Sequence, residues 1–288
     1  NISKFSVGEF DSTEWMKQGN ALLLSARTLR LSWTLNRRKI KKLFDSNQLS
    51  LSEENQVANV DLSLSGPSLL LVGYATEMFL KASLAKVMVG TSEQLFSNLA
   101  RVKFSHNLID LAIFVGFRVD KQTTQDLADL QNYIVHEGRY PLSASNPREI
   151  GVAFSERRRR STDAVAFRRY CRLARELARH STVLAGTPGD PVSHSAWILQ
   201  DDGYVSYRSG GGLPPRITYR MSSALEDDSD PYSALEQMAR SIPLLDKEWS
   251  NCDLYEEIVE LKVSLKAHRK NGARQPSASV QVLNMAPR

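Results

Sequence analysis

The stretch PSLLLVGYATEMFLKASLAKVMVG, residues 67–90, is the most apolar part of this 288-residue chain. Apolar side chains would occupy most of the circumference of a helix here, so the pattern predicts a central helix that is buried on most sides. Pro67 suits the first turn of this helix, and Gly90 suits its end. Glu77 and Lys81 stand out because apolar packing alone does not call for charges at these positions.

Amphipathic segments lie on both sides of the central helix. In residues 13–43 the apolar positions run from Trp15 to Trp33 at intervals of seven, four, three and four, which keeps them on one helical face. Further helices are predicted at 92–101, from Ser105 or His106 onward, at 121–138 and at 161–183. The polar segments 45–66 and 142–150 are predicted to be loops.

The last third of the chain has a different pattern. WILQDDGYVSYR at 197–208 places two β-rich runs around a glycine-containing turn, which predicts a β-hairpin. RITYRM at 216–221 predicts a third strand. Helices are predicted from about residue 232 and from Asp253 to Lys270. The second of these has acidic residues in its first turns and basic residues in its last, as the helix dipole favours.

These elements predict a mainly α fold in three regions. Residues 1–183 are expected to form an antiparallel helical bundle, and residues 184–272 a small α+β region with a hairpin and two helices. Residues 273–288 are expected to be a disordered tail.

The composition limits the class of protein. Cys171 and Cys252 have neither metal-ligand nor redox spacing, which favours a reduced, cytoplasmic protein without a metal site or cofactor. The N-terminal residues have no apolar run of the signal-peptide type, and no apolar run reaches the ~20 residues that span a membrane. The net charge of +5 permits an anionic partner.

Three segments resemble the HEPN family of prokaryotic helical-bundle domains. YATEMFLKASL (74–84) is similar to the family's second helix, and SHNLIDLA (105–112) to its "GHDL" helix start. LQNYIVHEGRYP (130–141) is similar to its closing signature, carried here by Tyr133 and Tyr140. The resemblance implies a homodimeric bundle that binds RNA or a nucleotide, within a bacterial defence or toxin–antitoxin system.

The same resemblance implies candidate catalytic residues. Ribonucleases of the family carry an arginine and a histidine separated by four to six residues, and Arg101 and His106 have that spacing. His136 and Arg139 occur in the reverse order beside the closing signature. A histidine exchanges protons and an arginine stabilises charge on the reacting phosphate. Either pair, placed at a dimer groove, would suit a metal-independent endoribonuclease.

Arginines dominate the charge pattern between residues 157 and 179, where nine of them accompany only two acidic residues. Guanidinium groups bind two phosphate oxygens at once, so this segment predicts a nucleic-acid contact. A solvated basic face is the alternative. The candidate contacts are Arg157, Arg158, Arg159, Arg160, Arg168, Arg169 and Arg172.

Three functions stay open at this point. The first is an RNA- or nucleotide-binding module, and the second is the metal-independent endoribonuclease. The third is a non-catalytic scaffold whose C-terminal region docks a protein partner. Glu77 and Lys81 are either an ordinary surface ion pair or a buried pair that serves a site or fixes the helix register.

Overall fold

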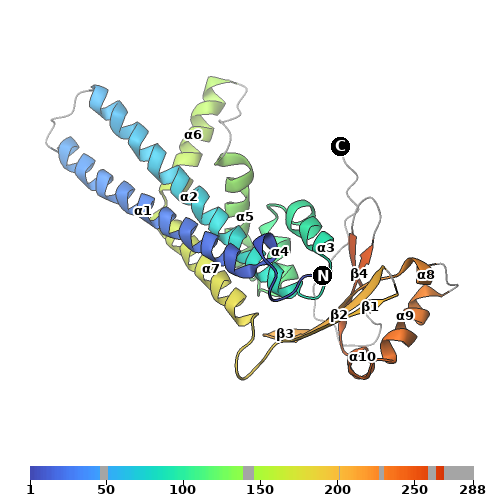
Figure 1. Ribbon diagram of the computed structural model, residues 1–288. Helices are drawn as coiled ribbons and strands as arrows, with labels where there is room; N and C mark the ends of the chain where they lie inside the picture. Colours follow the sequence, from blue (N-terminus) through green and yellow to red (C-terminus); the bar gives the residue numbers. More distant parts are fainter. Residues whose placement is uncertain (46–50, 139–145, 201, 227–229, 259–263, 269–288) are drawn as a thin grey trace. The chain divides into compact units, whose positions relative to one another are not determined.

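The computed structural model describes residues 1–45, 51–138, 146–200, 202–226, 230–258 and 264–268 (Figure 1). The fold is mainly helical with a C-terminal mixed sheet, which confirms the predicted fold class. The chain forms two compact units. The helical unit comprises Phe5–Val87 and Leu99–Val183, and the sheet unit comprises Asn1–Lys4, Met88–Asn98 and Leu184–Arg288. The predicted tail, 273–288, lies outside the described residues.

Long helices build the helical unit. α1 (Ser12–Asp45) lies along α2 (Leu51–Val87), and α7 (Ala164–Val183) packs on α2 as well (Figure 1). The remaining elements are the 3-10 turn η1 (Gly8–Phe10), the π-helical turns η2 (Leu99–Lys103) and η3 (Tyr133–Glu137), and the helices α4 (Leu108–Phe114), α5 (Lys121–Asn132) and α6 (Pro147–Thr162). Phe79 of α2 is fully buried. A Cβ at Gly19 would lie 2.6 Å from its ring, so α1 approaches α2 closely at a glycine.

The prediction of a loop over 45–66 was wrong, because α2 already begins at Leu51 and contains Pro67 in its interior. A proline inside a helix removes one backbone hydrogen bond and clashes with the preceding turn. Packing against α1 outweighs that cost here. Ser65 and Ser68, on either side of the proline, are both fully buried, and the Ser68 hydroxyl donates a hydrogen bond to the Ser65 carbonyl at 2.7 Å.

The loop predicted at 142–150 was wrong from Pro147 onward, where α6 begins. The side chain of Asn146 caps this helix by accepting a hydrogen bond from the Glu149 amide. Asn followed by Pro and then Glu is a local start signal that the arginine-rich stretch obscured. The predicted helix 161–183 is therefore two helices. The break lies at Asp163, whose carboxylate caps α7.

The sheet unit contains five strands in the order β1-β2-β3-β4-β5. β1 (Ser193–Leu199), β2 (Gly203–Gly210) and β3 (Leu213–Arg220) form an antiparallel meander, which confirms the predicted hairpin and third strand. β4 (Asp253–Ile258) pairs with β3 in parallel, and β5 (Ser264–His268) pairs with β4 in antiparallel orientation. The helices of this unit are α3 (Glu93–Asn98), α8 (Ser223–Glu226), α9 (Pro231–Arg240) and α10 (Pro243–Glu248).

The predicted helix from Asp253 to Lys270 was wrong, because β4 and β5 occupy this segment. Its charges matched a helix dipole, but the free edge of β3 provided a partner that the local pattern did not reveal. Leu254 pairs with Ile217 in the register and is buried in the core. Glu257 is also buried, where it accepts hydrogen bonds from Ser92 at 2.8 Å and Tyr204 at 2.6 Å.

His194 is expected to make the sheet unit sensitive to acid. It lies opposite Arg208 in the register of β1 and β2. Burial, followed by the charges of Arg208 and Lys4, lowers its pKa from 6.5 to about 4. In the unfolded chain His194 therefore binds a proton once the pH falls below 6.5, whereas in the folded chain it stays neutral down to about pH 4.

The contribution of neutral His194 to the free energy of unfolding is therefore complete above pH 6.5 and is lost as the pH falls toward 4. Urea unfolding of the parent protein and of His194→Gln, measured at several values between these limits, tests the prediction. The variant should lose less stability on acidification, by at most ~3 kcal/mol. Parallel pH profiles of the two proteins would refute it.

Within the described residues, one stretch, Ser63–Val87 of α2, is long and apolar enough to cross a membrane. Of its most apolar 18-residue window, 78% is buried inside the protein.

Candidate functional site

A buried carboxylate joins two of the sequence motifs in the helical unit. Glu77 of α2 is 2% exposed. Its Oε1 lies 2.7 Å from the Lys81 Nζ, and its Oε2 lies 2.9 Å from the His106 Nδ1. A carboxylate taken out of water needs such partners, because burying it unpaired costs several kcal/mol. Glu77 and Lys81 are therefore a buried pair, and they share one cluster with His106.

The backbone around His106 is irregular. The π-helical turn η2 ends at Lys103, and Ser105 has a φ of 36°, in the left-handed region that favours glycine. Asn107 then caps α4 by accepting a hydrogen bond from the Asp110 amide. Strained residues and π-helical turns occur preferentially at functional sites. In this segment they turn the chain so that the imidazole of His106 meets Glu77.

A carboxylate bound to one ring nitrogen orients a histidine and leaves the other nitrogen to exchange protons. The His106 side chain is 31% exposed, so its imidazole reaches solvent. In the tautomer in which Nδ1 donates to Glu77, Nε2 has the lone pair that a base requires. The cluster thus has the construction of a general acid–base group.

Arg101, the predicted partner of His106, is bound elsewhere. Its Nη2 lies 2.6 Å from the Glu9 Oε2, and its Nε donates to the same oxygen. Glu9 in turn accepts a hydrogen bond at its carbonyl from the Trp15 indole. The structure therefore gives His106 a buried carboxylate as its partner and ties Arg101 to the start of the helical unit.

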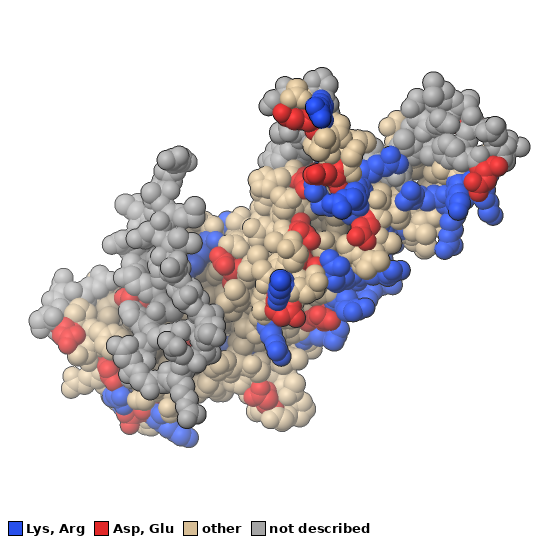
Figure 2. Space-filling view, turned by 180° about the vertical axis from the view of Figure 1, so that it is seen from behind, with Lys and Arg blue, Asp and Glu red and all other residues tan. Residues whose placement is uncertain are grey.

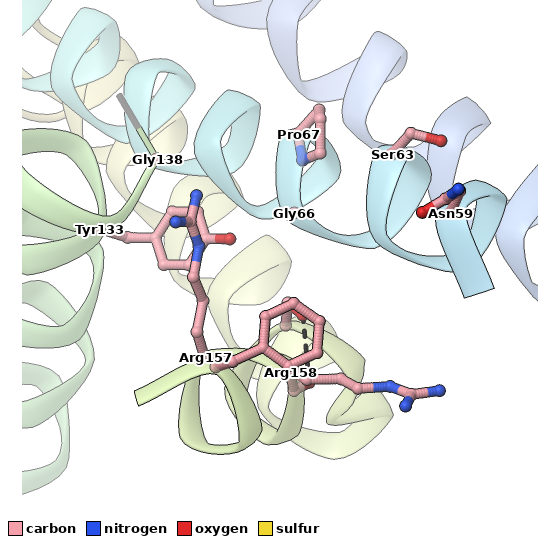
Figure 3. Close-up of a pocket in the computed structure, with 10 residues that line it drawn as sticks. Asn59, Ser63, Gly66, Pro67, Tyr133, Gly138, Arg157 and Arg158 are labelled. Carbon is pink, nitrogen blue, oxygen red and sulfur yellow. Dashed lines mark hydrogen bonds between the residues drawn. The ribbon is translucent and has the colours of Figure 1, made fainter. Parts of the chain in front are cut away.

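A cleft in the helical unit brings two predicted arginines to the closing signature. It has a volume of about 540 Å³ and lies between α2, η3 and α6 (Figure 3). Its lining includes Asn59, Ser63, Tyr133, Phe154, Arg157 and Arg158. Arg157 reaches toward Tyr133, whereas Arg158 extends in another direction (Figure 3). The cleft combines two cations, two aromatic rings and small hydrogen-bonding side chains.

Tyr133 forms a buried part of the cleft wall. It is 2% exposed, and its hydroxyl makes no hydrogen bond of normal geometry to a described residue. Burial raises the pKa of the phenol, and the positive charge of Arg157 opposes that rise. A ligand that displaced the Arg157 guanidinium could accept a hydrogen bond from the Tyr133 hydroxyl in the cleft wall.

The other predicted nucleic-acid contacts divide into two groups. Some are engaged within the protein: Arg160 pairs with Glu137 at 2.7 Å, and Arg169 pairs with Asp126 at 2.7 Å. Besides Arg160, the exposed arginines between residues 157 and 179 are Arg158, Arg159, Arg168, Arg172, Arg175 and Arg179. Basic side chains spread over the helical unit with acidic ones among them (Figure 2). Arg169 and Arg160 therefore bind carboxylates of α5 and η3, whereas Arg168 and Arg172 of α7 are exposed to solvent.

The second predicted catalytic pair is only partly described. His136 lies in η3 and is exposed. Arg139 and Tyr140 lie outside the described residues. The pair His136 and Arg139 therefore remains a prediction.

Sequence reasoning missed several residues of the cleft region. Asn59 and Ser63 were assigned to a loop, although they lie on α2 and line the cleft. Arg30 of α1 is 6% exposed, donates to the carbonyls of Ser161 and Thr162, and lies 4.1 Å from the Trp33 ring centre. Its charge holds the end of α6, which carries the arginines of the cleft. No local signal distinguishes Arg30 from the other arginines of the chain.

Comparisons of this chain with models of known protein families, with curated proteins and with solved structures found no significant match. The resemblance to the HEPN family thus remains an expectation that rests on three sequence segments. Among the described residues, no group of three or more His, Cys, Asp and Glu side chains gathers as metal ligands would. A function must be inferred from the cleft and from the Glu77 cluster.

Proposed function

We propose that the helical unit binds RNA or a nucleotide, with Arg157 and Arg158 as phosphate contacts in the cleft. The observation that carries this proposal is the hollow of about 540 Å³ that both arginines line together with Tyr133, with Arg157 reaching toward the tyrosine. Membership of the HEPN type, with a role in bacterial defence or in a toxin–antitoxin pair, is part of the same proposal.

The size and the lining of the cleft support this class of ligand. Sites for small molecules and cofactors usually measure ~300–1,000 Å³ and combine apolar walls with a few polar groups. Phe154 is 40% exposed and offers a ring face for a base. Asn59 and Ser63 offer hydrogen-bonding groups for a base edge or a ribose. The arginines then supply the charge that a phosphate requires.

The exposed arginines of α7 would extend the contact beyond the cleft. Arg168 and Arg172 are four residues apart on that helix and both face solvent. Their spacing places them on one side of the helix, where they can meet successive phosphates of a single strand. RNA binding through these groups would depend strongly on salt, because each neutralised phosphate releases a counterion.

The double variant Arg157→Gln, Arg158→Gln tests the proposal. We expect it to bind a labelled single-stranded RNA more weakly than the parent. We also expect the slope of log affinity against log salt to fall by about 1.4, since each lost contact to a single strand removes ~0.7. Lys247→Gln removes an exposed charge from the sheet unit and serves as the matched control.

The control should keep the parent slope. An equal slope in the double variant would move the binding surface away from the cleft. Absence of RNA binding by the parent at low salt would favour the third hypothesis, a scaffold that docks a protein partner.

The Glu77 cluster supports a second candidate function, a metal-independent endoribonuclease. His106, oriented by Glu77, would remove the proton of a ribose 2′-hydroxyl. The 2′-oxygen would then attack the adjacent phosphorus, and the bond from phosphorus to the 5′-oxygen of the next nucleotide would break. That oxygen would take up a proton from solvent, which gives a 2′,3′-cyclic phosphate end and a 5′-hydroxyl end. Cleavage of RNA in the presence of chelator, lost in His106→Asn and retained in His136→Ala, would support this assignment. The opposite pattern would transfer the role to His136, and activity that requires magnesium would exclude the mechanism.

A further inference from the structure

The outer face of α1 carries a stripe of residues at regular spacing, three of them leucines, that the described part of the chain leaves exposed. The stripe consists of Lys17, Ala21, Leu24, Thr28, Leu31, Leu35 and Arg38, and all of these residues are exposed. Their separations alternate between four and three residues, which is the heptad spacing of a coiled-coil seam. The exposed fractions of the three leucines are 64% for Leu24, 60% for Leu31 and 53% for Leu35.

Packing within the helical unit does not explain this stripe. The buried side chains of α1 are a different set, including Leu23, Ala26 and Trp33, which are 0–6% exposed. The helix is therefore apolar on two sides. Single exposed leucines are common on protein surfaces, but three at heptad spacing over about three helical turns form a continuous patch.

We propose that this seam is a self-association surface, on which α1 of a second copy of this chain lies in antiparallel orientation. The same stripe on both copies satisfies the requirement of a two-fold interface, in which one patch meets itself. The heptad spacing is the pattern by which two helices interlock side chains, so a second α1 is the occupant that fits it.

The distribution of charge along α1 selects the antiparallel orientation. Five cations crowd the C-terminal part of the helix, at Arg37, Arg38, Lys39, Lys41 and Lys42. A parallel pair would place the five cations of one copy against the five of the other. An antiparallel pair places each basic end near a helix start that carries Asp11 and Glu14 and the single cation Lys17. Antiparallel pairing therefore removes most of the repulsion.

The length of the stripe sets the strength of the interaction. Its apolar part, from Ala21 to Leu35, covers about two heptads and includes the polar Thr28. Such a seam is shorter than the ~3–4 apolar heptads that are typical of a coiled coil. The association should therefore be reversible and should depend on protein concentration. The proposal does not depend on RNA binding, because the seam contains none of the cleft residues.

Sedimentation equilibrium of the full chain over a range of concentrations tests the surface. We expect the parent to show a monomer–dimer equilibrium. In Leu31→Gln we expect the dimer to dissociate at least ~tenfold more readily, because each copy then places an amide near the middle of the seam. Leu31 is exposed, so the substitution should leave the thermal unfolding of the monomer unchanged. Leu244→Gln changes an exposed leucine of the sheet unit and should dimerise as the parent does.

Cysteine cross-linking tests the orientation. Antiparallel pairing brings position 24 of one copy close to position 35 of the other. A mixture of Leu24→Cys and Leu35→Cys should therefore form a mixed disulfide, whereas each variant alone should not. The parent, with its own Cys171 and Cys252, measures the background.

Cross-linking of each variant with itself would show a parallel pair and would overturn the proposed orientation. A parent that stays monomeric at high concentration, or a dimer that Leu31→Gln leaves unchanged, would overturn the proposed surface. Monomeric parent protein that binds lipid vesicles through Leu31 would assign the stripe to a membrane surface instead.

Discussion

Replacing Glu77 with alanine is expected to lower the free energy of unfolding by ~3–5 kcal/mol, because breaking a buried ion pair leaves charged groups without compensation. Lys81 has a side chain that is 12% exposed, and it would lose its carboxylate partner. His106 would lose the group that orients its imidazole. Urea unfolding followed by far-ultraviolet circular dichroism measures the change.

Two comparisons make this prediction specific to the buried charge. Glu14 and Lys17 form an exposed pair at 2.6 Å, so Glu14→Ala should cost less than ~1 kcal/mol. The double variant Glu77→Met, Lys81→Met removes both charges and retains most of the side-chain volume. It should be much more stable than Glu77→Ala, since apolar replacement of an entire buried pair is often neutral. A Glu77→Ala effect no larger than that of Glu14→Ala would contradict the prediction.

Replacing Trp249 with alanine is expected to destabilise the sheet unit by ~3–5 kcal/mol, through the loss of apolar contacts and the cavity left behind. Trp249 follows α10 and is fully buried in the core of this unit, together with Tyr219, Leu235 and Leu254. The core joins α9 and α10 to strands β2, β3 and β4. One indole therefore supports elements from several parts of the chain. Thermal unfolding followed by far-ultraviolet circular dichroism, which does not rely on tryptophan fluorescence, measures the effect.

Leu244→Ala is the control for the tryptophan substitution. This leucine lies on α10 but is 37% exposed, so its loss should cost far less. If Trp249→Ala unfolded at the same temperature and denaturant concentration as Leu244→Ala, the core assigned to the sheet unit would be wrong.

The correct and the wrong predictions of strands each have a physical cause. The hairpin at 197–208 was predictable because two β-rich runs and a glycine turn lie next to one another in the chain. The segment from Asp253 onward was not, since its charge pattern suits a helix and its strand state requires the distant edge of β3. The local sequence therefore predicts a strand reliably only when the strand that it pairs with lies next to it in the chain.

The candidate site shows the same division. Glu77 and Lys81 were recognisable as unexpected charges, because they interrupt an apolar helix at a spacing of four. His106 was recognisable because the segment that contains it resembles the "GHDL" helix start of the HEPN family. The contact between His106 and Glu77 was not predictable, because 29 residues separate them and a strained turn at Ser105 brings them together. Likewise, the separate helix α6 brings Arg157 to Tyr133.

The sequence by itself determined that this protein is mainly helical, that its central helix is buried and that its basic charge is carried largely by clustered arginines. These properties depend on periodicity and composition, which are local. Only the tertiary structure decided which charges are engaged. Arg169 and Arg160 bind carboxylates of other elements, whereas Arg168 and Arg172 of α7 face solvent. Side-chain pairing across elements depends on how helices pack, and packing depends on the whole chain at once.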